Sequence, residues 1–264
     1  MARVPWQRTE PEIDPGPAAD ATAGTTRDEA SLGELVARVA DDSGDRKDQL
    51  AALARGLAGG MKDAAGSGFR GAGSLLADVL ADAAPRLRIR DSATLRAHHP
   101  GLSDDELADV LIRNAARTTA AFGAAVGALA AVEFAAPPSL LAAPAQLAAE
   151  TLAVAATEVK LVAELHEIAG QPAHGNGTQR GSAYLMSWVR QRALDPQAGA
   201  AGLSAVLGHA AKRELRSMLV RRTGRSMSKL APFLAGAVAG GIVNRRVTRS
   251  LGDKLIAELR GRRY

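Results

Sequence analysis

The sequence predicts an all-α protein, and three features of its composition support this fold class. Apolar residues make up 47% of the 264 residues, enough for a sizeable core, whereas aromatic residues make up only 3%. The apolar content is mostly alanine and glycine, whose small side chains allow helices to pack closely. Val and Ile do not form alternating runs, which argues against a substantial sheet. We therefore expect a multi-helix bundle with two alanine- and glycine-rich core segments.

The chain is expected to divide into three regions. Residues 1–27 combine Pro, Gly, Asp and Thr with few large apolar residues, which predicts a disordered tail. Residues 28–95 are expected to form a short helical region and residues 96–264 the main helical domain. Within the first helical region, apolar residues recur at helical spacing at Leu32, Leu35, Val36, Val39, Leu50, Leu53, Leu57, Leu75, Leu76, Val79 and Leu80, with loosening by glycines between residues 56 and 73.

The clearest helix start lies in the segment HHPGLSDDELADVL. Ser103 can cap the first turn and Glu106 can reach back to it, so a long helix is expected from there to Ala136, before two prolines. A second long helix should cover residues 145–169 and stop at Gly170. After a loop over residues 172–182, further helices are expected over residues 183–194, 201–223, 229–244 and 247–260.

Two apolar segments are expected to form the centre of the bundle. Residues 118–149 carry one charge, Glu133, and residues 231–243 carry none, but prolines, alanine richness and short length argue against membrane spans. Each contains a pair of glycines four residues apart, which would let two backbones approach, and we expect the two segments to cross there. The alternative is two unrelated alanine-rich helices. The glycines expected at the crossing are Gly123, Gly127, Gly236 and Gly240.

Charge is distributed unevenly along the chain. Residues 180–264 carry 17 Lys/Arg against 4 Asp/Glu, a net charge of +13, whereas the rest of the chain carries −8. Basic amphipathic helices can lie on anionic membranes, although the same cations could be solvated or could meet the acidic part of the chain. Nucleic acid is disfavoured because few aromatic residues are available to stack on bases. The candidate cations for an anionic surface are Arg213, Arg216, Arg221, Arg222, Arg225, Lys229, Arg245 and Arg246.

No pattern in the sequence indicates catalysis, a metal or a cofactor. Without cysteine, thiolate chemistry is excluded, and the GxGxxG-like run at residues 66–71 lacks the preceding strand that dinucleotide binding requires. The charged residues of the second long helix, including Glu158 and Glu167, are interpreted as a solvated face with a Lys160/Glu164 pair. The candidate buried polar residues are Glu133 and Asn244, although exposure at the helix end is favoured for Glu133.

Residues of the C-terminal half resemble the EcsC family of bacterial proteins over about residues 100–260. The resemblance rests on the run APFLAG at residues 231–236 and on the long helix LAAETLAVAATEVKLVAELHEIAG. It also includes Gly240, Gly241, Asn244, Thr248, Leu251 and Gly252. Ala169 departs from the family pattern, in which a Tyr-Gly pair often ends that helix. What the resemblance implies is a helical fold and a membrane-linked accessory role, with no catalytic residues to transfer.

The expected function is that of a non-enzymatic accessory protein bound peripherally to the cytoplasmic membrane or to a membrane transporter complex. The N-terminus lacks the apolar core of a signal peptide, so a cytoplasmic location is expected, including the inner face of the cell membrane. Two alternatives remain open. One is a soluble helical module that binds a hydrophobic ligand or forms homo-oligomers, and the other is an unrecognised hydrolase.

Overall fold

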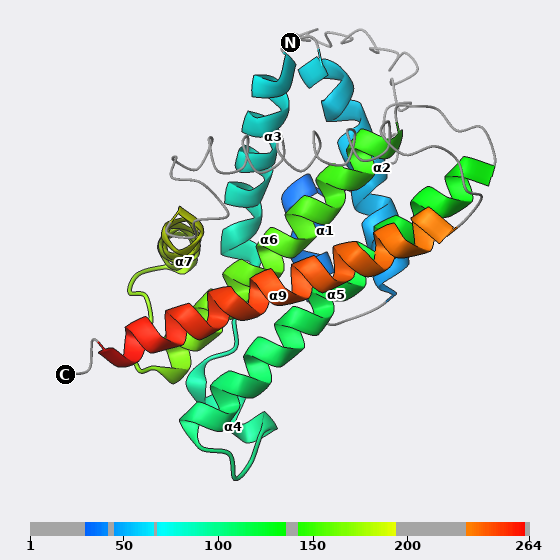
Figure 1. The fold of residues 1–264 in the computed structure, drawn as a ribbon. Coiled ribbons are helices and arrows are strands. Elements are labelled where there is room, and N and C mark those ends of the chain that lie inside the picture. The colour runs from blue at the N-terminus through cyan, green and yellow to red at the C-terminus, as the bar shows by residue number, and fades with distance from the viewer. Residues whose placement is uncertain (1–29, 42–44, 66–67, 136–141, 194–230, 262–264) are drawn as a thin grey trace, which may run out of the picture. The chain divides into compact units, whose positions relative to one another are not determined.

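The computed structural model describes residues 30–41, 45–65, 68–135, 142–193 and 231–261, and the described residues are almost entirely helical. They contain no strand, so the all-α prediction is confirmed for this part of the chain. The elements in order are α1 (Leu32–Ala40), α2 (Arg46–Ala65), α3 (Gly68–Ala83), the 3-10 helix η1 (Ala84–Arg86), α4 (Ser92–His98), α5 (Asp104–Ala135), α6 (Ala142–Ile168), α7 (Gly177–Ala193) and α9 (Ala231–Gly261), as Figure 1 shows.

Helix α5 begins, and helix α6 ends, where local sequence signals place their caps. At the start of α5, Ser103 Oγ accepts from the Glu106 amide at 3.3 Å, while Glu106 Oε2 accepts from the Ser103 amide at 2.9 Å. This reciprocal pair is the capping box that the sequence predicts. At the end of α6, Gly170 has a φ of +69°. Its amide donates to the carbonyl of Glu167, and the Gln171 amide donates to that of His166, which completes a Schellman motif.

Helix α7 begins six residues earlier than the sequence analysis placed it. Asn176 Oδ1 accepts from the Gln179 amide at 2.9 Å, and Gln179 Oε1 accepts from the Asn176 amide at 3.0 Å. This pairing satisfies two amides at the helix start, so the polar residues that follow, expected to form a loop, belong to the first turns of α7.

Helix α9 is continuous through the position where two separate helices were expected. Arg245 and Arg246 are exposed, whereas Asn244 is half-buried and Thr248 is buried. The cations therefore occupy the outer side of one helix and do not interrupt it. In the first helical region, the glycines that were expected to loosen the pattern lie within helices, because α2 continues to Ala65 and α3 begins at Gly68. The short helix α4 was not predicted.

Helix α6 lies at the centre of the core. It contacts α1, α2, α3, α5, α7 and α9, and apolar residues around its whole circumference are buried. The described residues from Ser31 onward belong to one compact unit. Core side chains from both sides of the boundary expected near residue 95 belong to a single cluster, including Leu53 and Leu80 on one side and Leu107, Leu161 and Leu255 on the other.

Helices α5 and α9 form the most extensive helix–helix contact of the described residues and run side by side in opposite directions (Figure 1). A Cβ added to Gly123 would lie 2.9 Å from the carbonyl carbon of Gly240 and 2.9 Å from Asn244 Nδ2. Real Cβ atoms essentially never come so close to backbone, so this approach requires glycine at position 123. The contact between α5 and α9 continues with a hydrogen bond between the Thr119 and Thr248 hydroxyls and with an ion pair between Asp105 and Arg260.

Several expectations fall on parts of the chain outside this description. Gly127 and Gly236 belong to α5 and α9, but their surroundings lie outside the described residues, and the same is true of the Glu133 side chain. The helix expected over residues 201–223 also lies outside them. Within the described part of the chain, no helix is both long enough and apolar enough to cross a bilayer. The cations that lie outside the described residues are Arg213, Arg216, Arg221, Arg222, Arg225 and Lys229.

Candidate functional site

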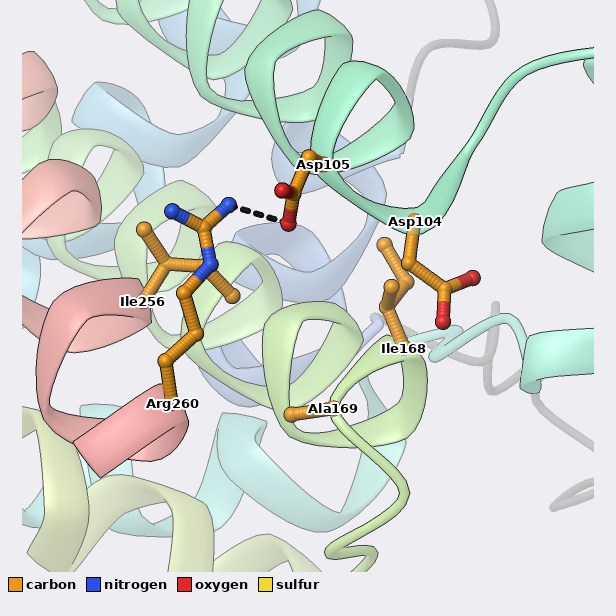
Figure 2. Close-up of a pocket in the computed structure, with 6 residues that line it drawn as sticks. All are labelled: Asp104, Asp105, Ile168, Ala169, Ile256 and Arg260. Carbon is orange, nitrogen blue, oxygen red and sulfur yellow. Dashed lines mark hydrogen bonds and ion pairs between the residues drawn. The ribbon is translucent and has the colours of Figure 1, made fainter. Parts of the chain in front are cut away.

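A small pocket lies where the start of α5 meets the ends of α6 and α9 (Figure 2). Its cavity volume is about 20 Å³, which is room for about one water molecule. Arg260 and Asp105 form an ion pair across it, while Asp104 points away. Asp104 instead pairs with Arg96 at 2.9 Å. The pocket is therefore too small for a substrate, and its charged groups are already paired.

The carboxylates of α6 are buried and Lys160 is half-buried, so the interpretation of a solvated face with a Lys160/Glu164 pair was wrong. Glu158 has 0%, Glu164 3% and Glu167 7% of its surface exposed. Lys160 pairs with Asp41, at the end of α1, at 2.9 Å and not with Glu164. Burial is tolerated because each of these groups has a partner of opposite charge on another element, which replaces the hydration lost on folding.

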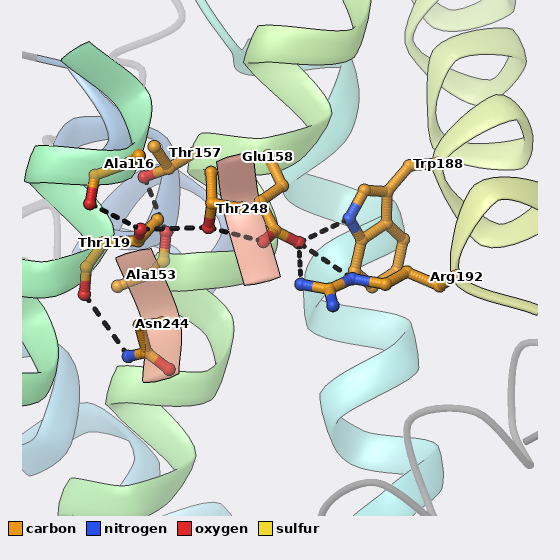
Figure 3. Close-up of polar contacts among 9 residues, drawn as sticks. All are labelled: Ala116, Thr119, Ala153, Thr157, Glu158, Trp188, Arg192, Asn244 and Thr248. Atoms are coloured by element: carbon orange, nitrogen blue, oxygen red, sulfur yellow. Dashed lines mark hydrogen bonds and ion pairs between the residues drawn. The ribbon is translucent and has the colours of Figure 1, made fainter. Parts of the chain in front are cut away.

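Glu158 is the centre of a polar network that joins three helices (Figure 3). Its Oε1 accepts a hydrogen bond from Thr248 Oγ1 of α9 at 2.7 Å. Its Oε2 accepts from Trp188 Nε1 at 2.9 Å and from Arg192 Nε at 3.0 Å, both on α7. The Arg192 Nη2 also contacts Oε2. Three donor groups, one of them the Arg192 guanidinium, therefore surround the buried carboxylate and replace the hydration that it loses on folding.

The network extends from Glu158 along the contact between α5 and α9. Thr119 Oγ1 lies 2.9 Å from Thr248 Oγ1. Because the single hydroxyl proton of Thr248 goes to Glu158, the Thr119 hydroxyl is the donor in this pair, and it shares its one proton with the Ala116 carbonyl at 3.2 Å. One helical turn away, Asn244 Nδ2 donates to the Thr119 carbonyl at 3.3 Å and to Glu150 Oε1 at 3.0 Å. Asn244 is half-buried and lies within this network.

Two further carboxylates of α6 bind other parts of the chain. Glu164 accepts from Arg90, which follows η1, through two parallel bonds of 2.7 and 2.8 Å. Glu167 accepts from Arg180 at 2.8 Å and from the Tyr184 hydroxyl at 3.2 Å. Burial raises the pKa of Tyr184, so its hydroxyl stays protonated and remains a donor.

The chemistry of this network is structural. Glu158 is fully buried and accepts from protein donors on both oxygens, so a substrate has no access to it in this structure. No group of three or more His, Cys, Asp or Glu side chains within the described residues could hold a metal ion. The buried acids of α6 instead connect α7, α9 and the segment after η1 to one central helix, and Lys160 connects the end of α1 to it.

The network could not be recognised from the sequence because its partners are far apart in the chain. Thr119 and Thr248 are 129 residues apart, and Glu158 and Arg192 are 34 apart. The sequence did contain one signal. Charged residues on an otherwise apolar helix must either be exposed or pair with buried partners. On α7, Trp188 can supply an N–H donor and Arg192 can supply both donors and a positive charge.

The outer side of α9 carries a different set of residues. We define the α9 outer face as Ile242, Val243, Arg245, Arg246 and Arg249, all of which are exposed. Ile242 is 60% and Val243 51% exposed, and among the described residues they are the one adjacent pair of large apolar side chains that is exposed. Of the cations that the sequence analysis proposed for an anionic surface, Arg245 and Arg246 are the two within the described residues, and both belong to this face.

Comparisons of the chain with protein-family models, with curated proteins and with solved structures found no match.

Proposed function

We propose that this protein is a non-enzymatic helical accessory protein that binds peripherally to an anionic membrane surface, at the cytoplasmic side of the cell membrane. The observation that carries this proposal is the α9 outer face, on which an exposed apolar pair is followed directly by exposed cations. Surfaces that combine apolar side chains with Lys or Arg bind the interface of anionic bilayers, because the apolar groups leave water while the cations meet phosphate.

Internal pairing accounts for only part of the positive charge in the C-terminal third of the chain. Arg180 and Arg192 neutralise the buried carboxylates of α6, and Arg260 pairs with Asp105. Arg245 and Arg246 form no ion pair with any residue of the described ranges, and they are exposed. Their charge is therefore directed at solvent and supports an external anionic partner.

The resemblance to the EcsC family agrees with this proposal, since it implies a role linked to a membrane complex. The association proposed is with the lipid surface itself. The further cations of the segment AKRELRSMLVRRTGRSMSKL, at residues 211–230, would contribute to it through their charge.

Cosedimentation with lipid vesicles tests the proposal. The full-length protein is expected to bind phosphatidylglycerol vesicles at low salt, to bind far less as salt rises, and to bind neutral phosphatidylcholine vesicles weakly. Replacing Arg221, Arg222 and Arg225 by Gln removes three cations. At about 1 kcal/mol each, this should weaken binding by about 3 kcal/mol, or roughly a hundredfold. Wild-type protein that stays in the supernatant at low salt would exclude the proposal and favour the soluble or oligomeric module.

A further inference from the structure

We infer that the α9 outer face is the part of the molecule that enters the bilayer interface, with Ile242 and Val243 inserted among the lipid chains and Arg245 and Arg246 at the phosphates. This inference rests on the proposed membrane binding and adds to it a defined site and an apolar contribution. A protein held by charge alone would remain outside the headgroups.

The geometry of α9 separates an inner from an outer side. Residues that face the core recur at helical spacing and are buried, among them Thr248, Leu251, Leu255 and Leu259. Ile242, Arg246, Arg249 and Asp253 recur at spacings of three and four residues on the opposite side. All four are exposed. Because the inner side is fixed to α5 and α6, the outer side is presented as a rigid surface and needs no rearrangement to meet a partner.

The apolar and cationic part of the face is limited in length. Ile242 and Asp253 are eleven residues apart, which corresponds to about 16 Å along a helix. Arg249 lies 3.9 Å from Asp253, so its charge is partly compensated. The part suited to an anionic interface therefore comprises Ile242, Val243, Arg245 and Arg246, and it ends before Asp253.

The charge of the α9 outer face favours an anionic bilayer over a second copy of this chain as its partner. A second copy placed on the same face would bring Arg245 and Arg246 near their own counterparts, which repel. An anionic bilayer supplies phosphates to the two cations and hydrocarbon to Ile242 and Val243 at the same place. Both kinds of side chain are then satisfied by one partner.

Because the sequence contains no cysteine, a single introduced cysteine can be labelled without background. Full-length Ile242→Cys carries an environment-sensitive fluorophore and is mixed with phosphatidylglycerol vesicles, with or without nitroxide-labelled acyl chains. The matched control is Met186→Cys, a 52% exposed apolar residue on α7. The fluorescence emission of the label at position 242 is expected to shift to shorter wavelength and to be quenched by the nitroxide. The emission of the label at position 186 is expected to change little.

Binding by unlabelled variants provides the second measurement. Ile242→Gln combined with Val243→Gln removes two apolar side chains without changing charge, and it is expected to lower the partition coefficient at least about tenfold. Met186→Gln is expected to leave it unchanged. If wild-type protein cosediments but the label at position 242 neither shifts nor is quenched, the inserted face is wrong and the charge-driven membrane binding stands.

Two other outcomes also contradict the inference. If wild-type protein fails to cosediment, both the inserted face and the proposed function are wrong. If the label at position 242 shifts in the absence of vesicles as protein concentration rises, a second copy of the chain occupies the face.

Discussion

Thr248 of α9 donates a hydrogen bond of 2.7 Å to the fully buried carboxylate of Glu158 on α6, across 90 residues of sequence. The same carboxylate accepts from Trp188 and Arg192 of α7. One side chain thus fixes two helices onto the central helix. It also fixes the orientation of α9, because Thr248 must face inward, and this places Ile242 and Arg246 on the opposite, solvent-facing side.

Removal of the Glu158 carboxylate should strongly destabilise the fold. In Glu158→Ala, the Arg192 guanidinium, the Trp188 ring nitrogen and the Thr248 hydroxyl all lose their acceptor in the core. Breaking a buried pair by removing one partner typically costs about 3–5 kcal/mol. Glu158→Gln should cost less, because an amide oxygen can still accept from α7 and Thr248 can turn to accept from the amide nitrogen. Urea unfolding measures the loss of unfolding free energy in both variants.

The matched control is the exposed pair of Arg249 and Asp253 on α9, whose side chains are about half exposed. Asp253→Asn should change the free energy of unfolding by less than about 1 kcal/mol, because exposed ion pairs contribute little. Equal losses for Glu158→Ala and Asp253→Asn would show that the Glu158 network does not hold the helices together.

The close approach of α5 and α9 predicts a different result for each of two facing glycines. Gly123→Ala should lower the free energy of unfolding by about 1–3 kcal/mol, since the new Cβ would lie 2.9 Å from the Gly240 backbone. Gly240→Ala should be tolerated, because its Cβ would lie 3.5 Å from the nearest atom, the Gly123 carbonyl oxygen, in ordinary contact. Thermal and urea unfolding distinguish the two.

Gly59 of α2 provides the control for helix propensity. A Cβ at this position would meet nothing within 4 Å, so Gly59→Ala should stabilise by about 0.5–1 kcal/mol. The packing account would be refuted by a Gly123→Ala variant that is as stable as Gly59→Ala.

The capping box of α5 predicts a pH dependence. The hydrogen bond from the Ser103 amide, and then that from its hydroxyl, lower the pKa of Glu106. A lowered native pKa means that the unfolded chain binds the proton first as pH falls. The stabilisation by Glu106 is therefore full above the unfolded pKa of about 4.3 and is lost as pH falls through the lower native pKa.

Glu106→Gln removes this dependence. The difference in urea midpoint between wild type and variant should be largest near about pH 6 and should shrink towards about pH 3. A difference that stays constant over this range would contradict the capping role of the Glu106 carboxylate.

Local signals in the sequence predicted the fold class, the start of α5 and the end of α6. Ser103 with Glu106, and Gly170, act through atoms within a few residues of each other, so the sequence contains the whole interaction. Asn176 with Gln179 is a signal of the same kind, and it was overlooked because the loop-like residues around it favoured a turn.

The buried polar network could not be predicted in the same way. Whether Glu158 and Glu164 face water or the core depends on where Arg192 and Arg90 lie, and these partners are 34 and 74 residues away. Helix α6 shows why local reasoning failed. A charged face on a helix usually indicates exposure, but here other elements surround the helix on all sides and supply the counter-charges.

The central claim, that the α9 outer face binds an anionic membrane, is tested most directly by removing its two cations. Arg245→Gln with Arg246→Gln should weaken binding to phosphatidylglycerol vesicles at low salt by about 2 kcal/mol, or roughly thirtyfold. The control, Arg38→Gln with Arg113→Gln, removes the same charge from an exposed position on α1 and a half-buried position on α5 and should bind nearly as wild type does. Equal vesicle affinities for the two double variants would contradict the claim.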